Sequence, residues 1–221
     1  MTPPPPAWHR FLPRRWSPEC WSLRYAADRL RAALYSFAHP GMPWLNAEAN
    51  RLLLAHLPEM PRVLEFGSGR STVFFARRAA RLLSFESHPA WHRRVARRLP
   101  RPPDTQLQHL LLPASAWLTR LATESKAAFD VVLVDGERRA DCVLAAWPLL
   151  TAGGLLILDN SNRYFPGEHP GPGSLRAWDR ENPEHRQWQQ IQALLAPYPQ
   201  TRTSDGVTQT LFVWKRPAQP N

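Results

Sequence analysis

From residue 62 to residue 158 the sequence alternates between short apolar segments and amphipathic ones, and this alternation limits the possible folds more than any other feature. The apolar segments are rich in β-favouring residues, and helical patterns separate them. Because parallel neighbours in a sheet need a crossover connection, the pattern predicts a doubly wound, mostly parallel α/β sheet. The predicted strands cover residues 62–66, 82–85, 106–112, 129–134 and 154–158, and the helices between them about 72–80, 90–99, 115–124 and 140–150.

The alternation of strand and helix patterns ends after residue 160. Residues 161–185 contain PGEHPGPG and little periodicity, so we expect a long loop that contacts substrate. A helix over about 183–195 and two strands near 200–204 and 208–214 follow, and Asp205-Gly206 between the strands is typical of a hairpin. The prediction is therefore a seven-stranded sheet that closes with an antiparallel hairpin.

The chain of 221 residues, 43% of them hydrophobic, fits one α/β domain with an N-terminal extension. We expect a flexible arm rich in Pro, Arg and Trp at 1–18, a helical cap at 19–58 and the main domain at 59–217. The cap pattern predicts helices at about 20–38 and 46–57. No signal peptide and no long apolar span is evident, which predicts a soluble cytoplasmic protein without an integral membrane segment.

The formal net charge of +10 is compatible with a polyanionic partner such as nucleic acid. Many of the arginines recur on the outer faces of the predicted helices, as at 77–81 and 93–98, where they form a solvated rim. The charge therefore leaves a nucleic-acid partner open without favouring it.

The segment VLEFGSGRST at 63–72 predicts a buried strand that runs through a glycine turn into a helix. Gly67 and Gly69 allow a ligand to approach bare backbone, and Ser71 and Thr72 are natural helix N-caps. The dinucleotide fingerprint requires a third glycine where this chain has Thr72, so a pyrophosphate ligand is disfavoured.

Acidic residues stand at or just after four of the predicted strands: Glu65, Glu86, Asp135 and Asp159. Ligands of open α/β sheets bind beyond the carboxyl ends of the strands, so these side chains mark the candidate site. Glu86 lies about twenty residues after the glycine turn, where a carboxylate can accept both hydroxyls of a ribose. The alternative is that Glu86 only caps the next helix.

The order of E-x-G-x-G, the ribose acid, VDG, GGLLILDN and a closing hairpin resembles the class I S-adenosylmethionine (SAM)-dependent methyltransferases over residues 44–216. The pattern is most similar to uncharacterised bacterial-type methyltransferase-like proteins that carry E-x-G-S-G-x-S-T and V-D-G-x-x-R. The resemblance implies a SAM site, with Ala114, Ser115 and Trp117 as the adenine wall. The cofactor-binding residues that it implies are Glu65, Gly67, Ser68, Gly69, Ser71, Thr72, Glu86, Ser115 and Asp135.

A partial resemblance to the metal-dependent O-methyltransferases implies that Asp135, Asp159 and Asn160 bind a divalent cation such as Mg²⁺. The alternative for Asp159-Asn160 is a turn-and-cap pair. That family usually has a lysine base where this chain has Arg138, which can orient an oxyanion but is a poor base. His169 in the long loop is another candidate base, so the predicted catalytic set is Asp135, Arg138, Asp159 and His169.

Together these features predict O-methylation of a small-molecule or glycan hydroxyl. Two alternatives stay open, an RNA methyltransferase and a catalytically inactive partner protein of the same fold. Trp44 and Trp178 flank the predicted site and are candidates to stack on a substrate. The pattern does not predict an oligomeric state.

Overall fold

The computed structural model describes residues 22–100, 106–165, 174 and 183–215. The predicted arm at 1–18 and most of the predicted substrate loop at 161–185, including His169 and Trp178, lie outside the described residues.

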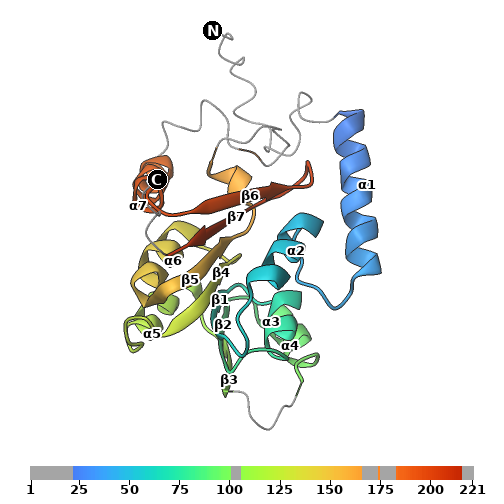
Figure 1. Cartoon of the computed structure of the whole chain (residues 1–221). Coiled ribbons are helices and arrows are strands. Elements are labelled where there is room, and N and C mark those ends of the chain that lie inside the picture. Colours follow the sequence, from blue (N-terminus) through green and yellow to red (C-terminus); the bar gives the residue numbers. More distant parts are fainter. Residues whose placement is uncertain (1–21, 101–105, 166–173, 175–182, 216–221) are drawn as a thin grey trace.

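A seven-stranded sheet in the order β3-β2-β1-β4-β5-β7-β6 forms the centre of the described chain (Figure 1). The five strands from β3 to β5 pair in parallel, while β7 is antiparallel to both β5 and β6. This topology confirms the predicted doubly wound sheet with its terminal hairpin. The strands are β1 (Arg62–Phe66), β2 (Arg81–Glu86), β3 (Gln106–Leu111), β4 (Phe129–Val134), β5 (Leu150–Leu158), β6 (Gln200–Ser204) and β7 (Gln209–Trp214).

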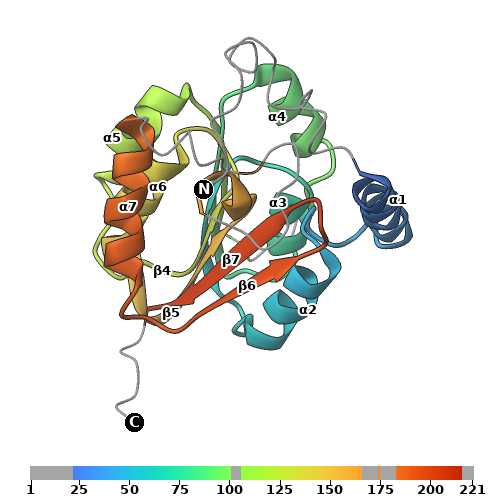
Figure 2. The ribbon, with the colours of Figure 1, turned by 90° about the horizontal axis from the view of Figure 1, so that it is seen from above.

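Helices cover both faces of the sheet, with α2, α3 and α4 on one face and α5, α6 and α7 on the other (Figures 1 and 2). They are α1 (Leu23–Ala38), α2 (Ala47–His56), α3 (Arg70–Phe75), α4 (Pro89–Ala96), α5 (Trp117–Leu121), α6 (Arg139–Ala146) and α7 (Pro183–Leu195). Short 3₁₀ turns occur at Ala114–Ala116, Trp147–Leu149 and Ser161–Arg163.

Alternate strand residues point into two separate cores, as the period of a β-strand requires. In β1, Leu64 joins a cluster with Trp117 and Ile191, while Val63 joins one with Leu53 on the opposite face. Both faces of the central strands are therefore buried, which explains why β1 and β4 read as nearly continuous apolar runs.

Several predicted boundaries are wrong. The helix predicted at 72–80 ends at Phe75, because the Ala80 amide donates to the Pro61 carbonyl (3.0 Å) and the chain turns into β2. The helix predicted at 115–124 is a 3₁₀ turn followed by the short α5. β5 begins at Leu150, earlier than predicted, because Leu150 pairs with Phe129 of β4.

The predicted cap contains the two expected helices. The inner face of α1 buries Tyr25, and Arg70 of the glycine turn donates to the Ser36 carbonyl (3.1 Å) near the end of α1. The opposite face of α1 is apolar and exposed: Leu23 keeps 92%, Leu30 61%, Leu34 59% and Phe37 87% of its accessible area. No described helix has the length and apolar character needed to cross a bilayer.

Candidate cofactor site

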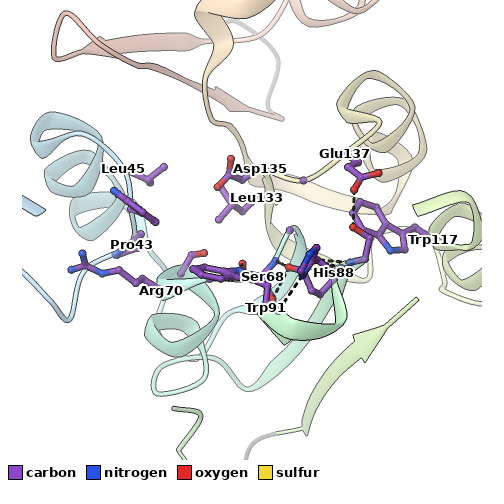
Figure 3. A pocket seen from close by; sticks show the side chains of 17 residues that line it. Pro43, Leu45, Ser68, Arg70, His88, Trp91, Trp117, Leu133, Asp135 and Glu137 are labelled. Atoms are coloured by element: carbon purple, nitrogen blue, oxygen red, sulfur yellow. Dashed lines mark hydrogen bonds between the residues drawn. The ribbon is translucent and has the colours of Figure 1, made fainter. Parts of the chain in front are cut away.

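A pocket of about 390 Å³ lies at the carboxyl ends of β1, β2 and β4. Its lining comes from the β1–α3 turn, the β2–α4 connection, the turn after β4 and the segment Pro43–Leu45 before α2 (Figure 3). It lies beside the switch point, where the chain order reverses between β1 and β4. Its volume is that of a site for one small organic ligand.

Two glycines let the turns after β1 and β4 touch. Gly67 has φ +88°, and a Cβ there would lie 2.6 Å from the Gly136 nitrogen. A Cβ on Gly136 would in turn lie 2.8 Å from the Trp117 ring and 2.9 Å from the Gly67 nitrogen. Neither position can carry a side chain, so the pocket floor is bare backbone. Gly136 is a site residue that the sequence interpretation missed.

Glu65 lies under the glycine turn and is fully buried. Its Oε2 accepts hydrogen bonds from the hydroxyls of Thr72 (2.6 Å) and Ser84 (2.5 Å). Thr72 Oγ1 also accepts from the Gly69 amide (2.7 Å), so Glu65 and Thr72 brace the turn from below. Neither of these two residues lines the pocket.

Burial raises the pKa of the Glu65 carboxyl to about 7. The hydroxyls of Ser71, Ser84 and Thr72 oppose that rise, and the charge of Glu86 adds to it. Glu65 Oε1 has no hydrogen-bond partner among the described residues. Because Glu65 lies below the turn and does not line the pocket, its charge would act on a ligand above the turn without direct contact.

Glu86, at the end of β2, lines the pocket and organises its wall. Oε2 accepts from the Ser68 amide (3.1 Å) and hydroxyl (2.9 Å), and Oε1 accepts from the amides of Ser87 (2.9 Å) and His88 (2.8 Å). Protein donors thus occupy about four acceptor positions of this carboxylate. A ribose hydroxyl would have to replace one of them, and the Ser68 hydroxyl is the one that can rotate away.

Aromatic side chains complete the walls. The Trp91 indole nitrogen donates to the Ser68 carbonyl (2.6 Å), and the Trp117 indole nitrogen donates to the Leu112 carbonyl (3.0 Å). Both rings line the pocket, as does Trp44, which is 66% exposed. Trp91 and His88 were missed by the sequence interpretation, although they follow Glu86 within the connection that the spacing singled out.

Asp135, directly after β4, faces the pocket opposite Ser68 and Trp91 (Figure 3). Its Oδ1 accepts from Arg139 Nη2 (2.8 Å), and its side chain keeps 37% of its accessible area. Burial raises the pKa of the Asp135 carboxyl, and the Arg139 charge opposes the rise.

Asp159, directly after β5, lies behind Asp135 and is 4% exposed. Its Oδ1 accepts from the Thr210 hydroxyl of β7 (2.8 Å), and its Oδ2 accepts from the side-chain Nδ2 of Asn160 (2.8 Å). Burial, together with the charge of Asp135, raises the pKa of the Asp159 carboxyl to about 7.

The predicted metal ligands Asp135, Asp159 and Asn160 do not form an open cation site. Both oxygens of Asp159 are hydrogen-bonded, one of them to Asn160 itself, and Asp135 is paired with a guanidinium. Among the described residues, no group of three or more His, Cys, Asp or Glu side chains is placed to hold a metal ion. The metal site stays a prediction, and this donor arrangement does not fit it.

The other predicted site residues divide clearly. Six of the nine predicted cofactor residues line the pocket: Gly67, Ser68, Gly69, Ser71, Glu86 and Asp135. Ser115 is exposed and is not among the lining residues. Arg138 pairs with Asp141 (2.8 Å) outside the pocket, and the neighbouring Arg139 reaches Asp135 instead.

Residues 64–161 match a family model described as a methyltransferase domain. This range contains the glycine turn and the acids Glu86, Asp135 and Asp159. Over these residues, which are less than half of the chain, the sequence is similar to that family. The matched range begins in β1 and ends just after Asn160, so it holds both the glycine turn and the ends of β4 and β5. No curated protein sequence matches the chain.

Solved structures share the fold of these residues and of the elements around them. The O-methyltransferase TomG from Streptomyces achromogenes, involved in tomaymycin synthesis and solved with SAM, is 21% identical, with a TM-score of 0.55 over 88% of this chain and 90% of that one. An O-methyltransferase from Bacillus cereus solved with SAH is 17% identical, with a TM-score of 0.54 over 88% and 92%. A protein from Corynebacterium glutamicum is 15% identical, with a TM-score of 0.58 over 97% and 98%. At these identities the likeness concerns the fold.

Proposed function

We propose that this chain is a SAM-dependent methyltransferase that methylates a hydroxyl oxygen of a small molecule or glycan. The observation that carries the proposal is the pocket itself, a bare glycine floor with Glu86 on one wall and Asp135 on the other. TomG, solved with SAM, and the Bacillus cereus protein, solved with SAH, are both O-methyltransferases, which supports the choice of cofactor and of oxygen as the acceptor atom.

The residues fit SAM at three points. The turn Gly67–Gly69 admits close contact with backbone, the Glu65 carboxylate offers a negative charge below it, and Glu86 stands where ribose hydroxyls would lie. Trp91 and Trp117 offer flat apolar walls for a purine. When bound, SAM supplies a methyl group activated by the positive charge on sulfur.

Methyl transfer to oxygen then requires in-line positioning and removal of the hydroxyl proton. We assign the removal of this proton to Asp135, because Asp135 faces the pocket and its Oδ2 makes no hydrogen bond to another described residue. The raised pKa of this carboxyl makes it a stronger base than an exposed aspartate. Arg139, which holds Oδ1, keeps the free oxygen in place.

Calorimetric titration of SAM and SAH into the full chain tests the cofactor assignment. We expect Glu86→Gln to weaken SAM binding by about tenfold or more, because glutamine cannot accept all four donors that converge on Glu86. Ser68→Ala frees one acceptor position on Glu86 and is expected to leave SAM affinity unchanged or improved. Absence of SAM binding to the unmodified chain would refute the proposal.

Transfer of a labelled methyl group to a panel of hydroxyl-bearing small molecules and oligosaccharides then tests the acceptor class. We expect a methyl ether as product, identified by NMR, and loss of transfer in Asp135→Asn with SAM binding retained. Methylation of a nitrogen atom or of RNA in place of a hydroxyl would contradict the acceptor assignment.

A further inference from the structure

Two buried acids, one partly exposed acid and one buried arginine meet at the ends of β1, β4 and β5. Glu65 is fully buried, Asp159 is 4% exposed and Arg139 is 8% exposed. Buried charges are costly unless a charge of opposite sign and hydrogen bonds compensate them. The position of Arg139 is therefore a defining feature of this region, and Arg139 is also the arginine that ends the V-D-G-x-x-R pattern of the sequence.

Four oxygen atoms surround the Arg139 guanidinium. Nε donates to the Gly136 carbonyl (2.9 Å), and Nη2 donates to the Asp135 carbonyl (2.8 Å) and to Asp135 Oδ1 (2.8 Å). Nη1 donates to the Asp159 carbonyl. Every guanidinium nitrogen is thus bonded, and the group links the end of β4 to the end of β5.

Main-chain carbonyls and a carboxylate, the groups in this set, are among the oxygen ligands that Ca²⁺ takes in proteins. Here this oxygen shell is directed at a guanidinium. The carboxylate oxygens of Asp159 accept hydrogen bonds from Thr210 and from the Asn160 side chain instead. A divalent cation at this place would have to displace a buried side chain that makes four hydrogen bonds.

We infer that Arg139 is a built-in cation that takes the place of a divalent metal at the ends of β4 and β5, so that the site works without one. Arg139 is a positioning residue: it fixes Asp135 Oδ1 and leaves Oδ2 directed to the pocket. Unlike metal binding, which competes with protons, the guanidinium charge is constant across the physiological pH range. The inference concerns cation binding and does not rest on the proposed methyl transfer.

Electron paramagnetic resonance of added Mn²⁺ tests the inference on the full chain, because bound Mn²⁺ loses the sharp signal of the free ion. We expect the unmodified chain to leave the Mn²⁺ signal unchanged. Arg139→Gln removes the cation from an oxygen shell beside three acids, and we expect this variant to bind about one Mn²⁺. Arg139→Lys restores a cation and should again exclude Mn²⁺.

Arg138→Gln is the matched control, since it removes the adjacent arginine, whose partner is the partly exposed Asp141, and should leave the Mn²⁺ signal as in the unmodified chain. SAM titration of the unmodified chain should give the same affinity in Mg²⁺ and in EDTA.

Stoichiometric Mn²⁺ binding to the unmodified chain that is lost in Asp159→Asn would overturn the inference. A folded Arg139→Gln variant that takes up no Mn²⁺ would overturn it as well. If Arg139→Gln does not fold, the unmodified chain and Arg139→Lys still decide the question. Failure to bind SAM would refute the proposed function alone, because the Mn²⁺ measurement is independent of the cofactor.

Discussion

Replacing Glu65 by glutamine should remove part of the pH dependence of this chain's stability. The carboxyl has a pKa of about 7 in the folded chain against 4.5 for an ordinary glutamate. The difference corresponds to about 3 kcal/mol when the group is fully ionised. Because Glu65 is fully buried, solvent screening does not reduce this figure.

The sign follows from proton binding. Between pH 4.5 and pH 7 the folded chain holds a proton on Glu65 that the unfolded chain has released, so the free energy of unfolding falls as pH rises. From pH 5 to pH 8 this carboxyl should lower the stability by about 2 to 3 kcal/mol. In the variant, the glutamine carbonyl oxygen can still accept from the hydroxyls of Thr72 and Ser84, so their hydrogen bonds are retained.

Urea unfolding at pH 5 and pH 8, without SAM, measures the effect. Asp159, with a pKa near 7, contributes in the same direction in both proteins, so the informative quantity is the difference between them. The free energy of unfolding of Glu65→Gln, relative to that of the unmodified chain, should be about 2 to 3 kcal/mol higher at pH 8 than at pH 5. Glu48→Gln, at a side chain that is 53% exposed, is the control. An equal stability difference at both pH values would show that Glu65 does not titrate as argued.

Five further substitutions test the packing and the pocket. Gly67→Ala should cost at least about 3 kcal/mol and abolish SAM binding, because its Cβ meets backbone at 2.6 Å. Gly153→Ala, with a similar φ of +81° but open space, should cost only about 1–2 kcal/mol in the same urea measurement. Leu30→Glu on the exposed face of α1 should change the unfolding free energy by about 0.5 kcal/mol or less, whereas Leu53→Ala in the core should cost about 2–5 kcal/mol. Trp91→Phe removes the indole hydrogen bond to the glycine turn, and calorimetry should show SAM binding weakened by about three- to tenfold.

The sequence predicts the sheet well because both faces of β1 and β4 are buried, which leaves an apolar run with a clear end. It predicts the starts and ends of helices poorly. α3 stops at Phe75 since Ala80 joins the strand ladder at Pro61, a contact between residues distant in the sequence. Local patterns contain no information about such a partner.

In the candidate site, too, local features are predicted from the sequence and contacts between distant residues are not. Glu86 and the glycine turn are recognisable from spacing, because a strand, a turn and a helix start are local features. Arg138 and Arg139 are adjacent and chemically identical, and the backbone gives them different roles. Arg138 has φ +49° before the first turn of α6, which directs its side chain to Asp141 and leaves Arg139 to turn inward.

The hydrogen bond from Thr210 to Asp159 joins residues 51 positions apart, and the hydroxyl comes from the last strand in the described chain. As the chain emerges from the ribosome, Asp159 appears well before the group that satisfies it. β7 must also insert between β5 and β6, so the sheet cannot close until this late segment arrives. Asp159 therefore gains its hydrogen bond from Thr210 late in folding. Cleavage of the chain just before β7 would leave the buried Asp159 carboxyl without this donor.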